Sequence, residues 1–465
     1  MTALDDWIDQ EARFAATAML RAVSATKLVK ERPGFGQRVV PRRGSVLASP
    51  VPAAYDPDPD YFFHWFRDSA IIIDALRVAE VERLETQDAV ERLREFVEFD
   101  LAVRKLDGRE FVRRELFREK IQPSFLQYVR PNDEMAAVFG EAVLAEARVN
   151  PDGTLDFTRW ARPQNDGPAL QVLALMRWHN AQPDLDDALR AGMRDLLTGD
   201  LNFIGTYAAE RSFDIWEEEF GYHYYTRLVQ AEALVRGAEW LEDNGDARQA
   251  AACHSVADTL ISTLDAHWSA ADCYYRSRTD VAGGLPEKTL DIAVILGVLH
   301  AGRAKGAHSV LDPKSQATLA ALEDLFNAEY PVNQERPADQ GPAIGRYAKD
   351  TYYGGNPWYL ATLAAAEFYF KLAIALRSGA EMPVTSDNAR FREHLGEESP
   401  AQAAFRRGNT FMRTVQAHTP PSGDLSEQFD RATGAQTSAK HLAWSYAAFI
   451  TAHASRRQAA QAIRG

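Results

Sequence analysis

Two glutamates lie in segments whose composition suits acid–base chemistry. Glu217 is part of Phe213–Phe220 (Phe-Asp-Ile-Trp-Glu-Glu-Glu-Phe), and Glu427 is part of Asp424–Phe429 (Asp-Leu-Ser-Glu-Gln-Phe). Apolar neighbours can raise the pKa of a carboxyl group toward neutrality. Hydrolysis of a glycosidic bond uses two carboxyl groups in different environments, because one donates a proton while the other activates water or attacks the sugar. Acidic residues near aromatic ones are common, so the pair by itself only suggests this chemistry.

Three further segments combine aromatic residues with arginine, amide and carboxylate side chains just before a predicted helix. They are Tyr61–Asp68 (Tyr-Phe-Phe-His-Trp-Phe-Arg-Asp), Trp160–Pro168 (Trp-Ala-Arg-Pro-Gln-Asn-Asp-Gly-Pro) and Arg346–Trp358. An aromatic ring can stack on a sugar ring, and arginine and carboxylate groups can hold its hydroxyls. One such segment is typical of an ordinary helix start with an ion pair. Three of them favour a common cleft for a polyhydroxylated ligand.

Other catalytic chemistries lack a matching motif. The eleven histidines form neither H-E-x-x-H nor a Cys/His cluster with the spacing of metal ligands. The chain has no G-x-x-x-x-G-K-[ST] phosphate loop, no G-x-G-x-x-G after a strand and no G-x-S-x-G elbow. Ser426 lies beside Glu427 but has no evident histidine partner. We therefore expect no metal, no cofactor and no serine nucleophile.

The bulk composition is that of a globular protein with an acidic surface. The 465 residues are 46% hydrophobic and 25% charged, and the formal net charge is -14. Basic residues form only short patches such as Arg42-Arg43, which excludes the basic footprint of a nucleic-acid-binding protein. An acidic surface suits a neutral ligand.

Cysteine content and the terminal sequence bear on the compartment. Two cysteines, Cys253 and Cys273, could form a disulfide, but so few in a chain of this size favour a reducing compartment. The N-terminal residues are acidic and lack the basic and apolar regions of a signal peptide. No run of eighteen apolar residues occurs, so we expect no membrane-spanning helix and a cytoplasmic location.

Apolar residues spaced three and four apart predict helices along most of the chain. The predicted helical segments are 9–29, 67–83, 86–105, 168–180, 185–198, 222–242, 247–268, 288–301, 313–328, 357–377, 402–417 and 438–455. Asn356-Pro357 and Asp166-Gly-Pro168 are typical helix starts, with a capping side chain followed by proline. Strand-like alternation is local, as around 274–279. The chain is therefore predicted to be all-α.

Two predicted helices indicate how the others are arranged. Residues 361–371 and 442–452 are apolar nearly all round, as expected for the inner ring of a double-layered helical barrel. No short sequence repeat indicates a solenoid. The stretches 32–60, 330–346 and 379–400 are richer in proline and glycine and are interpreted as long loops rather than linkers. We therefore expect a single domain over 1–465.

Taken together, these segments resemble the glucoamylases of glycoside hydrolase family 15. The similar segments occur in the family order and span about residue 45 to the C-terminus: Tyr61–Ser69, Trp160–Leu170, Asp214–Glu218, Arg346–Glu367 and Leu425–Ala448. The resemblance implies an (α/α)6 barrel, which agrees with the independent prediction of an all-α fold. It also implies release of β-D-glucose from the non-reducing ends of α-glucans or malto-oligosaccharides with inversion of configuration.

The resemblance implies a role for each carboxyl group of the pair. Glu217 would be the general acid that protonates the glycosidic oxygen, and Glu427 the general base that activates water. An inverting enzyme holds its two carboxyl groups roughly 6.5–9.5 Å apart, which leaves room for that water. Both glutamates lie in predicted loops between helices, as expected for a site at one mouth of the barrel.

The resemblance also implies which residues bind the sugar. Arg67, Asp68 and Arg346 would hold hydroxyls of the terminal glucose, and Tyr61 and Trp444 would shape the first subsite. Glu218, Trp160, Tyr352 and Trp358 would reach this subsite or the next ones. The remaining candidates in the same segments are Trp65, Arg162, Trp216 and Asp350. We expect an oligosaccharide or α-glucan substrate, a monomer, and no starch-binding module.

Some residues depart from the family pattern and leave the preferred linkage open. They are His64, Phe66, Glu219 and the pair Ala348-Lys349. Alternatives within the family are a glucodextranase that cleaves α-1,6 bonds and a trehalase. An alternative of another class is a glucan-binding regulator without catalysis, although both carboxyl groups and the aromatic segments are present.

Overall fold

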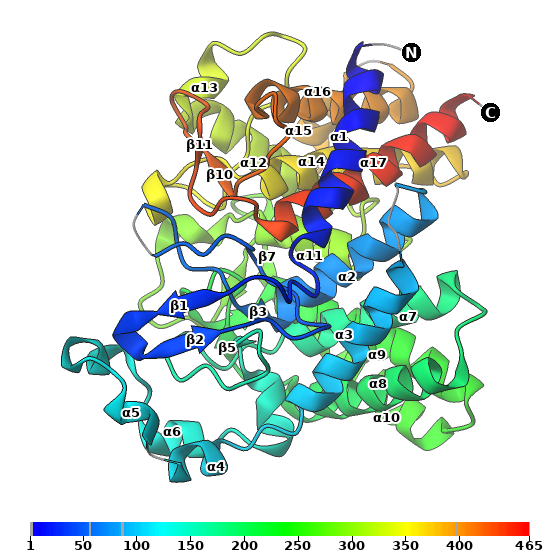
Figure 1. Cartoon of the computed structure of the whole chain (residues 1–465). Helices are drawn as coiled ribbons and strands as arrows, with labels where there is room; N and C mark the ends of the chain where they lie inside the picture. Colours follow the sequence, from blue (N-terminus) through cyan, green and yellow to red (C-terminus); the bar gives the residue numbers. More distant parts are fainter. Residues whose placement is uncertain (1–2, 55–56, 85–87, 115, 397, 465) are drawn as a thin grey trace.

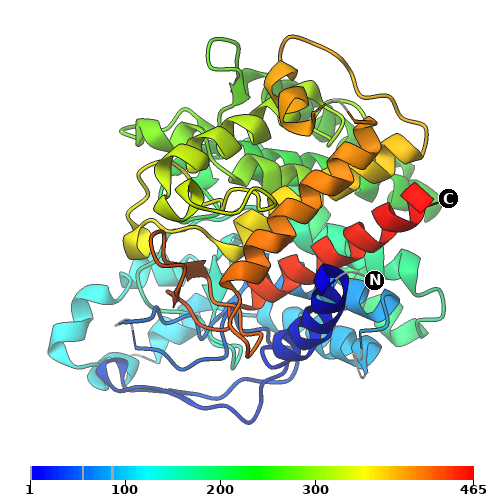
Figure 2. The same ribbon diagram turned by 90° about the horizontal axis from the view of Figure 1, so that it is seen from above.

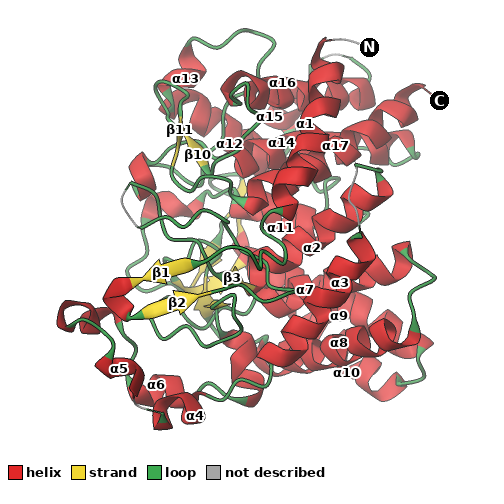
Figure 3. Ribbon diagram, viewed as in Figure 1, coloured by secondary structure: helices red, strands yellow, loops and turns green. Residues whose placement is uncertain are grey.

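Helices dominate the computed structural model of the chain, which describes residues 3–54, 57–84, 88–114, 116–396 and 398–464 (Figures 1 and 3). In chain order they are α1 Ala3–Leu20, α2 Phe66–Val81, α3 Ala89–Val103, α4 Gly108–Arg113, α5 Leu116–Glu119, α6 Asn132–Ala136, α7 Gly167–Ala181, α8 Asp187–Tyr207, α9 Tyr224–Asp243, α10 Ala247–Leu264, α11 Ala293–Ala301, α12 Pro313–Glu329, α13 Pro331–Gln334, α14 Tyr359–Arg377, α15 Ala389–Leu395, α16 Pro400–His418 and α17 Ala443–Arg464.

The strands are short, and each pairs with its partner in antiparallel fashion. They are β1 Lys30–Arg32, β2 Gln37–Val39, β3 His64–Trp65, β4 Arg148–Val149, β5 Ser212–Phe213, β6 Phe220–His223, β7 Trp268–Ser269, β8 Tyr274–Tyr275, β9 Arg278–Thr279, β10 Gln428–Phe429 and β11 Gln436–Thr437. The pairs are β1–β2, β3–β4, β7–β8 and β10–β11, and one sheet has the order β5–β6–β9.

The long helices form an (α/α)6 barrel, which confirms the predicted fold class. Among the described residues, α2, α7, α9, α11, α14 and α17 form an inner ring: each packs against the next, and α17 packs against α2 to close the ring. The outer layer is α1, α3, α8, α10, α12 and α16. Figure 2 shows α17 (red) between α1 (dark blue) and α16 (orange).

The distribution of apolar residues accounts for the two layers. In the inner helix α14, 14 of 19 residues are buried, whereas only 8 of 19 are buried in the outer helix α16. A helix that is apolar on most sides must be covered on most sides, and one with a single apolar stripe needs one neighbour. By length and composition α14 could also span a membrane, but 78% of its apolar window is buried inside the fold, as in the core helix of a globular protein.

The predicted helices are confirmed, but several of their bounds are wrong. The helix predicted over 9–29 corresponds to α1, which begins at Ala3 and already ends at Leu20. Beyond this end, Val23 forms a β-bridge with Val46. The segment 288–301 begins only at Ala293, since Pro286–Thr289 forms a separate short turn of 3-10 helix. The segment 438–455 begins at Ala443 and continues to Arg464. Residues 86–87 of the predicted segment 86–105 lie outside the described residues.

The two predicted capping residues have other roles. Helix α14 begins at Tyr359, and the Asn356 side chain instead accepts a hydrogen bond from the backbone of Arg431 at 3.0 Å. Asp166 does precede α7, but its carboxylate makes no capping bond and faces Arg67 at 3.4 Å. The local strand predicted around 274–279 is confirmed as β8 and β9.

A long connection precedes each inner helix, and the candidate residues lie in these connections or, for Arg67, Asp68 and Trp444, in the first turn of the helix that follows. The connections run over 21–65, 104–166, 208–223, 265–292, 330–358 and 419–442. They contact one another directly: the backbone of Phe213 donates to Pro163 O at 2.9 Å, and Trp358 pairs with Gln428. The predicted common mouth of the barrel is therefore formed at the N-terminal ends of the inner helices.

Candidate active site

A cavity of about 270 Å³ lies where these connections meet. Of the fifteen candidate residues, thirteen line it: Tyr61, Trp65, Arg67, Asp68, Trp160, Trp216, Glu217, Glu218, Arg346, Tyr352, Trp358, Glu427 and Trp444. Ala48, Ile215 and Leu442 complete the lining. Both glutamates of the catalytic hypothesis therefore face one small cavity from different connections. Trp444 also lines a second cavity, which lies between inner helices.

A buried ion pair shapes the turn that presents Glu217. Glu217 lies between β5 and β6 with a φ of 65°, in the left-handed region that non-glycine residues rarely adopt. Oδ1 of Asp214 accepts hydrogen bonds from the backbone of Glu218 at 2.8 Å and of Glu219 at 2.7 Å. Its Oδ2 pairs with Lys288 at 2.6 Å. Burial alone would raise the pKa of Asp214, but Lys288, His223 and the bond from the backbone of Glu219 lower it to about 2.

The carboxyl group of Glu217 accepts three N–H bonds. Trp65 Nε1 donates to Oε1 at 2.7 Å, Gln164 Nε2 donates to the same oxygen at 2.8 Å, and Trp160 Nε1 donates to Oε2 at 2.5 Å. Arg67 lies 3.6 Å from Oε1. A protonated carboxyl group retains three acceptor lone pairs, so the same bonds fit a proton on Oε2. The site can thus hold this carboxyl group in either protonation state.

Glu427 lies in a drier environment just before β10. Only 1% of it is exposed, and Ser438 donates a hydrogen bond to its Oε2. Burial raises the pKa of Glu427 to about 7, against the opposing effect of hydrogen bonds from Ser438 and Tyr61. The expectation of an apolar setting is therefore confirmed for Glu427, whereas N–H donors surround Glu217.

Two arginines are fixed on the wall of the cavity. Arg346 forms a bidentate pair with Asp350, at 2.7 and 2.6 Å, and also contacts Glu218 at 2.8 Å. Arg67 donates to Gln164 at 2.9 Å and lies 3.3 Å from Asp68. Burial raises the pKa of Asp68 to about 6 although Arg67 opposes the shift. A fixed guanidinium beside a carboxyl group suits recognition of sugar hydroxyls.

The structure does not bring Arg162 and Asp350 to the cavity lining. Arg162 is held by Glu146 at 2.6 Å and by Asp156 at 3.0 Å, and both carboxylate oxygens of Asp350 bind Arg346. Direct substrate contact by these two residues is therefore not supported, because their polar groups are already bonded. The departures from the family pattern, namely His64, Phe66, Glu219, Ala348 and Lys349, do not line the cavity either.

Sequence reasoning missed four residues that hold the candidate catalytic groups in place, directly or through the backbone. Gln164 and Ser438 hydrogen-bond to the two glutamates, and Asp214 and Lys288 fix the turn between β5 and β6. Gln164 and Asp214 lie inside segments that were already singled out. Lys288 lies 70 residues from Glu218, and nothing in its neighbourhood in the sequence indicates the pairing.

Comparisons with known proteins agree with this geometry. The family model for glycosyl hydrolases family 15 matches residues 121–454. Glucoamylase 1 of Rhizopus oryzae is 30% identical over 332 residues, which cover 66% of this chain and 55% of that protein. The probable glucoamylase of Schizosaccharomyces pombe is 29% identical over 476 aligned residues, which cover 97% of this chain and 91% of that protein. The chain thus spans little more than half the length of the first of these relatives.

A solved structure matches the whole barrel. The family 15 glucoamylase from Hypocrea jecorina superposes with a TM-score of 0.79 at 27% identity, covering 98% of this chain and 72% of that one. The match in fold therefore extends beyond the segments that contain the candidate residues.

Proposed function

The chain belongs to glycoside hydrolase family 15, and we propose that it is a glucan 1,4-α-glucosidase, or glucoamylase. It would release β-D-glucose from the non-reducing ends of α-glucans or malto-oligosaccharides. The observation that carries the proposal is the placement of Glu217 and Glu427 on one cavity of about 270 Å³. This volume is slightly below the usual range of about 300–1,000 Å³ for ligand pockets, which suits one end of a chain better than its middle.

In the proposed reaction Glu217 donates a proton to the glycosidic oxygen. As the proton leaves, negative charge develops on its carboxyl group. The N–H groups of Trp65, Trp160 and Gln164 already point at that group and stabilise the charge without reorganisation. This interaction is stronger in the transition state than before it, which is the condition for catalysis.

Glu427 activates the attacking water in this proposal. A carboxylate whose pKa is raised to about 7 is a stronger base than an ordinary carboxylate, and Ser438 and Tyr61 hold it by hydrogen bonds. The water would lie between the two carboxyl groups and attack the face opposite the leaving group, so the configuration inverts. Arg67 and Arg346 would hold the hydroxyls of the terminal glucose.

Glutamine variants test the two roles. We expect Glu217→Gln and Glu427→Gln each to lose at least about 10²-fold in kcat on maltose, as for loss of a positioned acid or base. Glu217→Gln should retain more activity on p-nitrophenyl α-D-glucoside, because nitrophenolate leaves without a proton. If Glu427→Gln is instead the variant spared on this substrate, the roles are reversed. If wild type releases no glucose from any substrate, the chain is a glucan-binding protein without catalysis.

A substrate panel tests the linkage. Glucose release from maltose, maltoheptaose, isomaltose and trehalose should be fastest on the α-1,4-linked compounds. Faster hydrolysis of isomaltose would make the chain a glucodextranase, and hydrolysis of trehalose alone would make it a trehalase. Soluble oligosaccharides are the proposed substrates, with starch and glycogen as candidate sources.

We also propose a monomer in the cytoplasm. Cys253 and Cys273 are both free thiols, as suits a reducing compartment. Among the described residues, the exposed large hydrophobic side chains are scattered over the chain: Val29, Val81, Leu126, Tyr128, Phe139, Phe220, Leu285 and Val384. Exposed apolar residues are ordinary on a monomer surface where they form no large contiguous patch. Sedimentation and cell fractionation test the two statements.

A further inference from the structure

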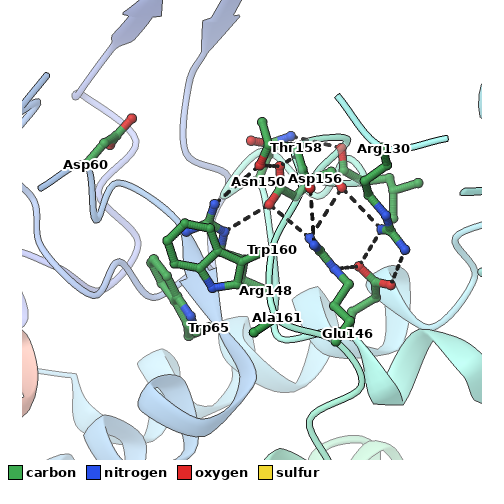
Figure 4. A network of polar contacts seen from close by, with 12 residues as sticks. Asp60, Trp65, Arg130, Glu146, Arg148, Asn150, Asp156, Thr158, Trp160 and Ala161 are labelled. Atoms are coloured by element: carbon green, nitrogen blue, oxygen red, sulfur yellow. Dashed lines mark hydrogen bonds and ion pairs between the residues drawn. The ribbon is translucent and has the colours of Figure 1, made fainter. Parts of the chain in front are cut away.

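A buried polar network lies behind two of the tryptophans of the cavity (Figure 4). Its centre is Arg148, on β4, with a side chain that is 0% exposed. Arg148 Nε binds Asp156 Oδ2 at 2.9 Å, and NH2 donates to Thr158 at 3.3 Å. Asp156 also pairs with Arg162 at 3.0 Å. A fully buried arginine is costly, so its position calls for an explanation beyond one ion pair.

The guanidinium of Arg148 packs against aromatic faces. Its central carbon lies 3.6 Å from the ring centre of Trp160, 4.6 Å from that of Trp65 and 3.9 Å from that of Phe63. Among the residues that the structure describes, its NH1 group has no hydrogen-bond partner. A guanidinium against the face of an indole is attracted by the ring quadrupole, most strongly where water is excluded. These contacts account for the buried group that lacks a hydrogen bond.

The same two indoles donate to Glu217. Trp65 Nε1 bonds to Oε1 and Trp160 Nε1 bonds to Oε2, so one cation contacts both donors of one carboxyl group. A cation on the ring face draws electron density from the indole and makes its N–H a stronger donor. Because hydrogen bonds favour the group's charged form, a stronger donor stabilises the carboxylate that remains after proton transfer.

The charge in contact with the indoles has the sign that this effect requires. Arg148 is the cation on both ring faces, whereas Arg130 pairs with Glu146. The charged groups that face Glu217 from the other side are Arg67, at 3.6 Å, together with its partners Asp68 and Asp166. Of these three groups one is a cation and two are carboxyl groups, and burial raises the pKa of each of these carboxyl groups.

We infer that Arg148 is a positioning residue for the proposed general acid. It holds the indoles of Trp65 and Trp160 in place, strengthens their hydrogen bonds to Glu217, and so assists transfer of the proton to the leaving group. Arg148 contacts neither substrate nor the reacting atoms. The inference rests on the proposed function, since it needs Glu217 to act as an acid.

The test compares Arg148→Met, Arg148→Lys and Arg130→Met in the full chain. Arg130 belongs to the same network, is 5% exposed and contacts neither indole, so Arg130→Met is a matched control for loss of a buried arginine. Each variant is assayed on two substrates. Maltose needs a proton on the leaving oxygen, whereas p-nitrophenyl α-D-glucoside needs little or no protonation of its leaving group. The pH profile of kcat/KM on maltose is recorded for each.

We expect Arg148→Met to lower kcat on maltose about 10-fold or more, and to lower kcat on the nitrophenyl glucoside less than about 3-fold. The limb of its profile that is set by deprotonation of Glu217 should move to higher pH, because the carboxylate form of the acid is less stabilised. Arg148→Lys keeps the positive charge. Its kcat on maltose and its pH profile should therefore lie between those of Arg148→Met and those of wild type. Arg130→Met should keep the wild-type ratio of the kcat values on the two substrates, and its pH profile should match that of wild type.

Equal losses on both substrates with an unmoved pH profile would show that Arg148 only supports the fold, and would overturn the inference. If Arg148→Met does not fold, Arg148→Gln decides, because it removes the charge but keeps a polar side chain: its maltose-to-nitrophenyl ratio must fall at least about 3-fold, and a smaller change overturns the inference. A wild type that releases no glucose from either compound would instead overturn the proposed function.

Discussion

The hydroxyl group of Ser438 donates a hydrogen bond to Oε2 of Glu427, whose carboxyl group is otherwise buried. The backbone fixes this contact, because the N–H of Glu427 donates to Ala439 O at 2.7 Å and so joins the two segments that carry the residues. Burial raises the pKa of Glu427 to about 7, and the bond from Ser438 opposes this shift. The hydroxyl of Ser438, together with that of Tyr61, thus affects how far the base can be used at acidic pH.

Replacing Ser438 by alanine should move the acidic limb of the activity profile to higher pH. The substitution removes a bond that favours the carboxylate, so the pKa of Glu427 rises and the base is protonated at a higher pH; a shift of about 0.5–1 unit is expected. The measurement is kcat/KM on maltose from pH 3 to 9. Ser426→Ala is the control, since Ser426 donates to Gln428 O and not to Glu427. Superimposable acidic limbs for wild type and Ser438→Ala would contradict the prediction.

Replacing Glu427 by glutamine should stabilise the fold at neutral pH while abolishing activity. The folded protein holds a proton on Glu427 up to about pH 7, whereas the unfolded chain loses it near 4.5. Between these values the folded state binds more protons, so the free energy of unfolding falls as pH rises, by at most about 3 kcal/mol. The glutamine variant has no ionisable group at this position, so its free energy of unfolding does not fall with pH in this way.

Thermal unfolding at pH 4 and pH 8 measures the effect. The melting temperature of Glu427→Gln should match wild type at pH 4 and exceed it at pH 8. The surface variant Glu335→Gln is the control and should match wild type at both. A Glu427→Gln protein that is no more stable than wild type at pH 8 would refute the raised pKa.

Replacing Lys288 by methionine should destabilise the fold and reduce kcat together. Lys288 Nζ lies 2.6 Å from both Asp214 and Glu218, and its side chain is 1% exposed. Without it, Asp214 is a buried carboxylate held only by backbone N–H groups, a change that costs roughly 3–5 kcal/mol. The turn between β5 and β6 should then loosen and misplace Glu217.

Chemical denaturation and initial rates on maltose check this prediction for Lys288. Lys349→Met is the matched control, because Lys349 pairs with Glu287 at 2.9 Å on the exposed surface. Exposed pairs contribute little to stability, so neither property should change in the control. The pairing has no catalytic importance if Lys288→Met keeps the wild-type kcat.

The sequence predicts the barrel and most of the cavity because both depend on local patterns. The inner helices are apolar on most sides, and each candidate segment lies directly before one of them, where the connections meet. Thirteen of fifteen candidates line the cavity for this reason. Helix starts are predicted less well: Asn356 has the residue type of a cap, yet it is used to bind the backbone of Arg431.

The remaining features depend on contacts between segments that are distant in the chain. Arg162 lies two residues from Trp160, but the nearby carboxylates Glu146 and Asp156 draw it away from the cavity. Lys288 is recognisable as important only when its contact with Asp214 is known. Residue types and spacing therefore identify groups that can react, and the three-dimensional structure identifies the groups that hold them.

The anomer released first distinguishes the proposed mechanism from its main competitor. If water is activated by Glu427 and attacks opposite the leaving group, an α-linked substrate gives β-glucose. If Glu427 attacks the sugar itself, a covalent intermediate forms and α-glucose results. Proton NMR during the first minutes of maltoheptaose hydrolysis resolves the two anomers, with a sample of pure α-glucose in the same buffer to measure the rate of spontaneous mutarotation. We expect the β-anomer to accumulate first. An initial excess of the α-anomer would mean that the two carboxyl groups are too close to admit a water, against the expected separation of roughly 6.5–9.5 Å.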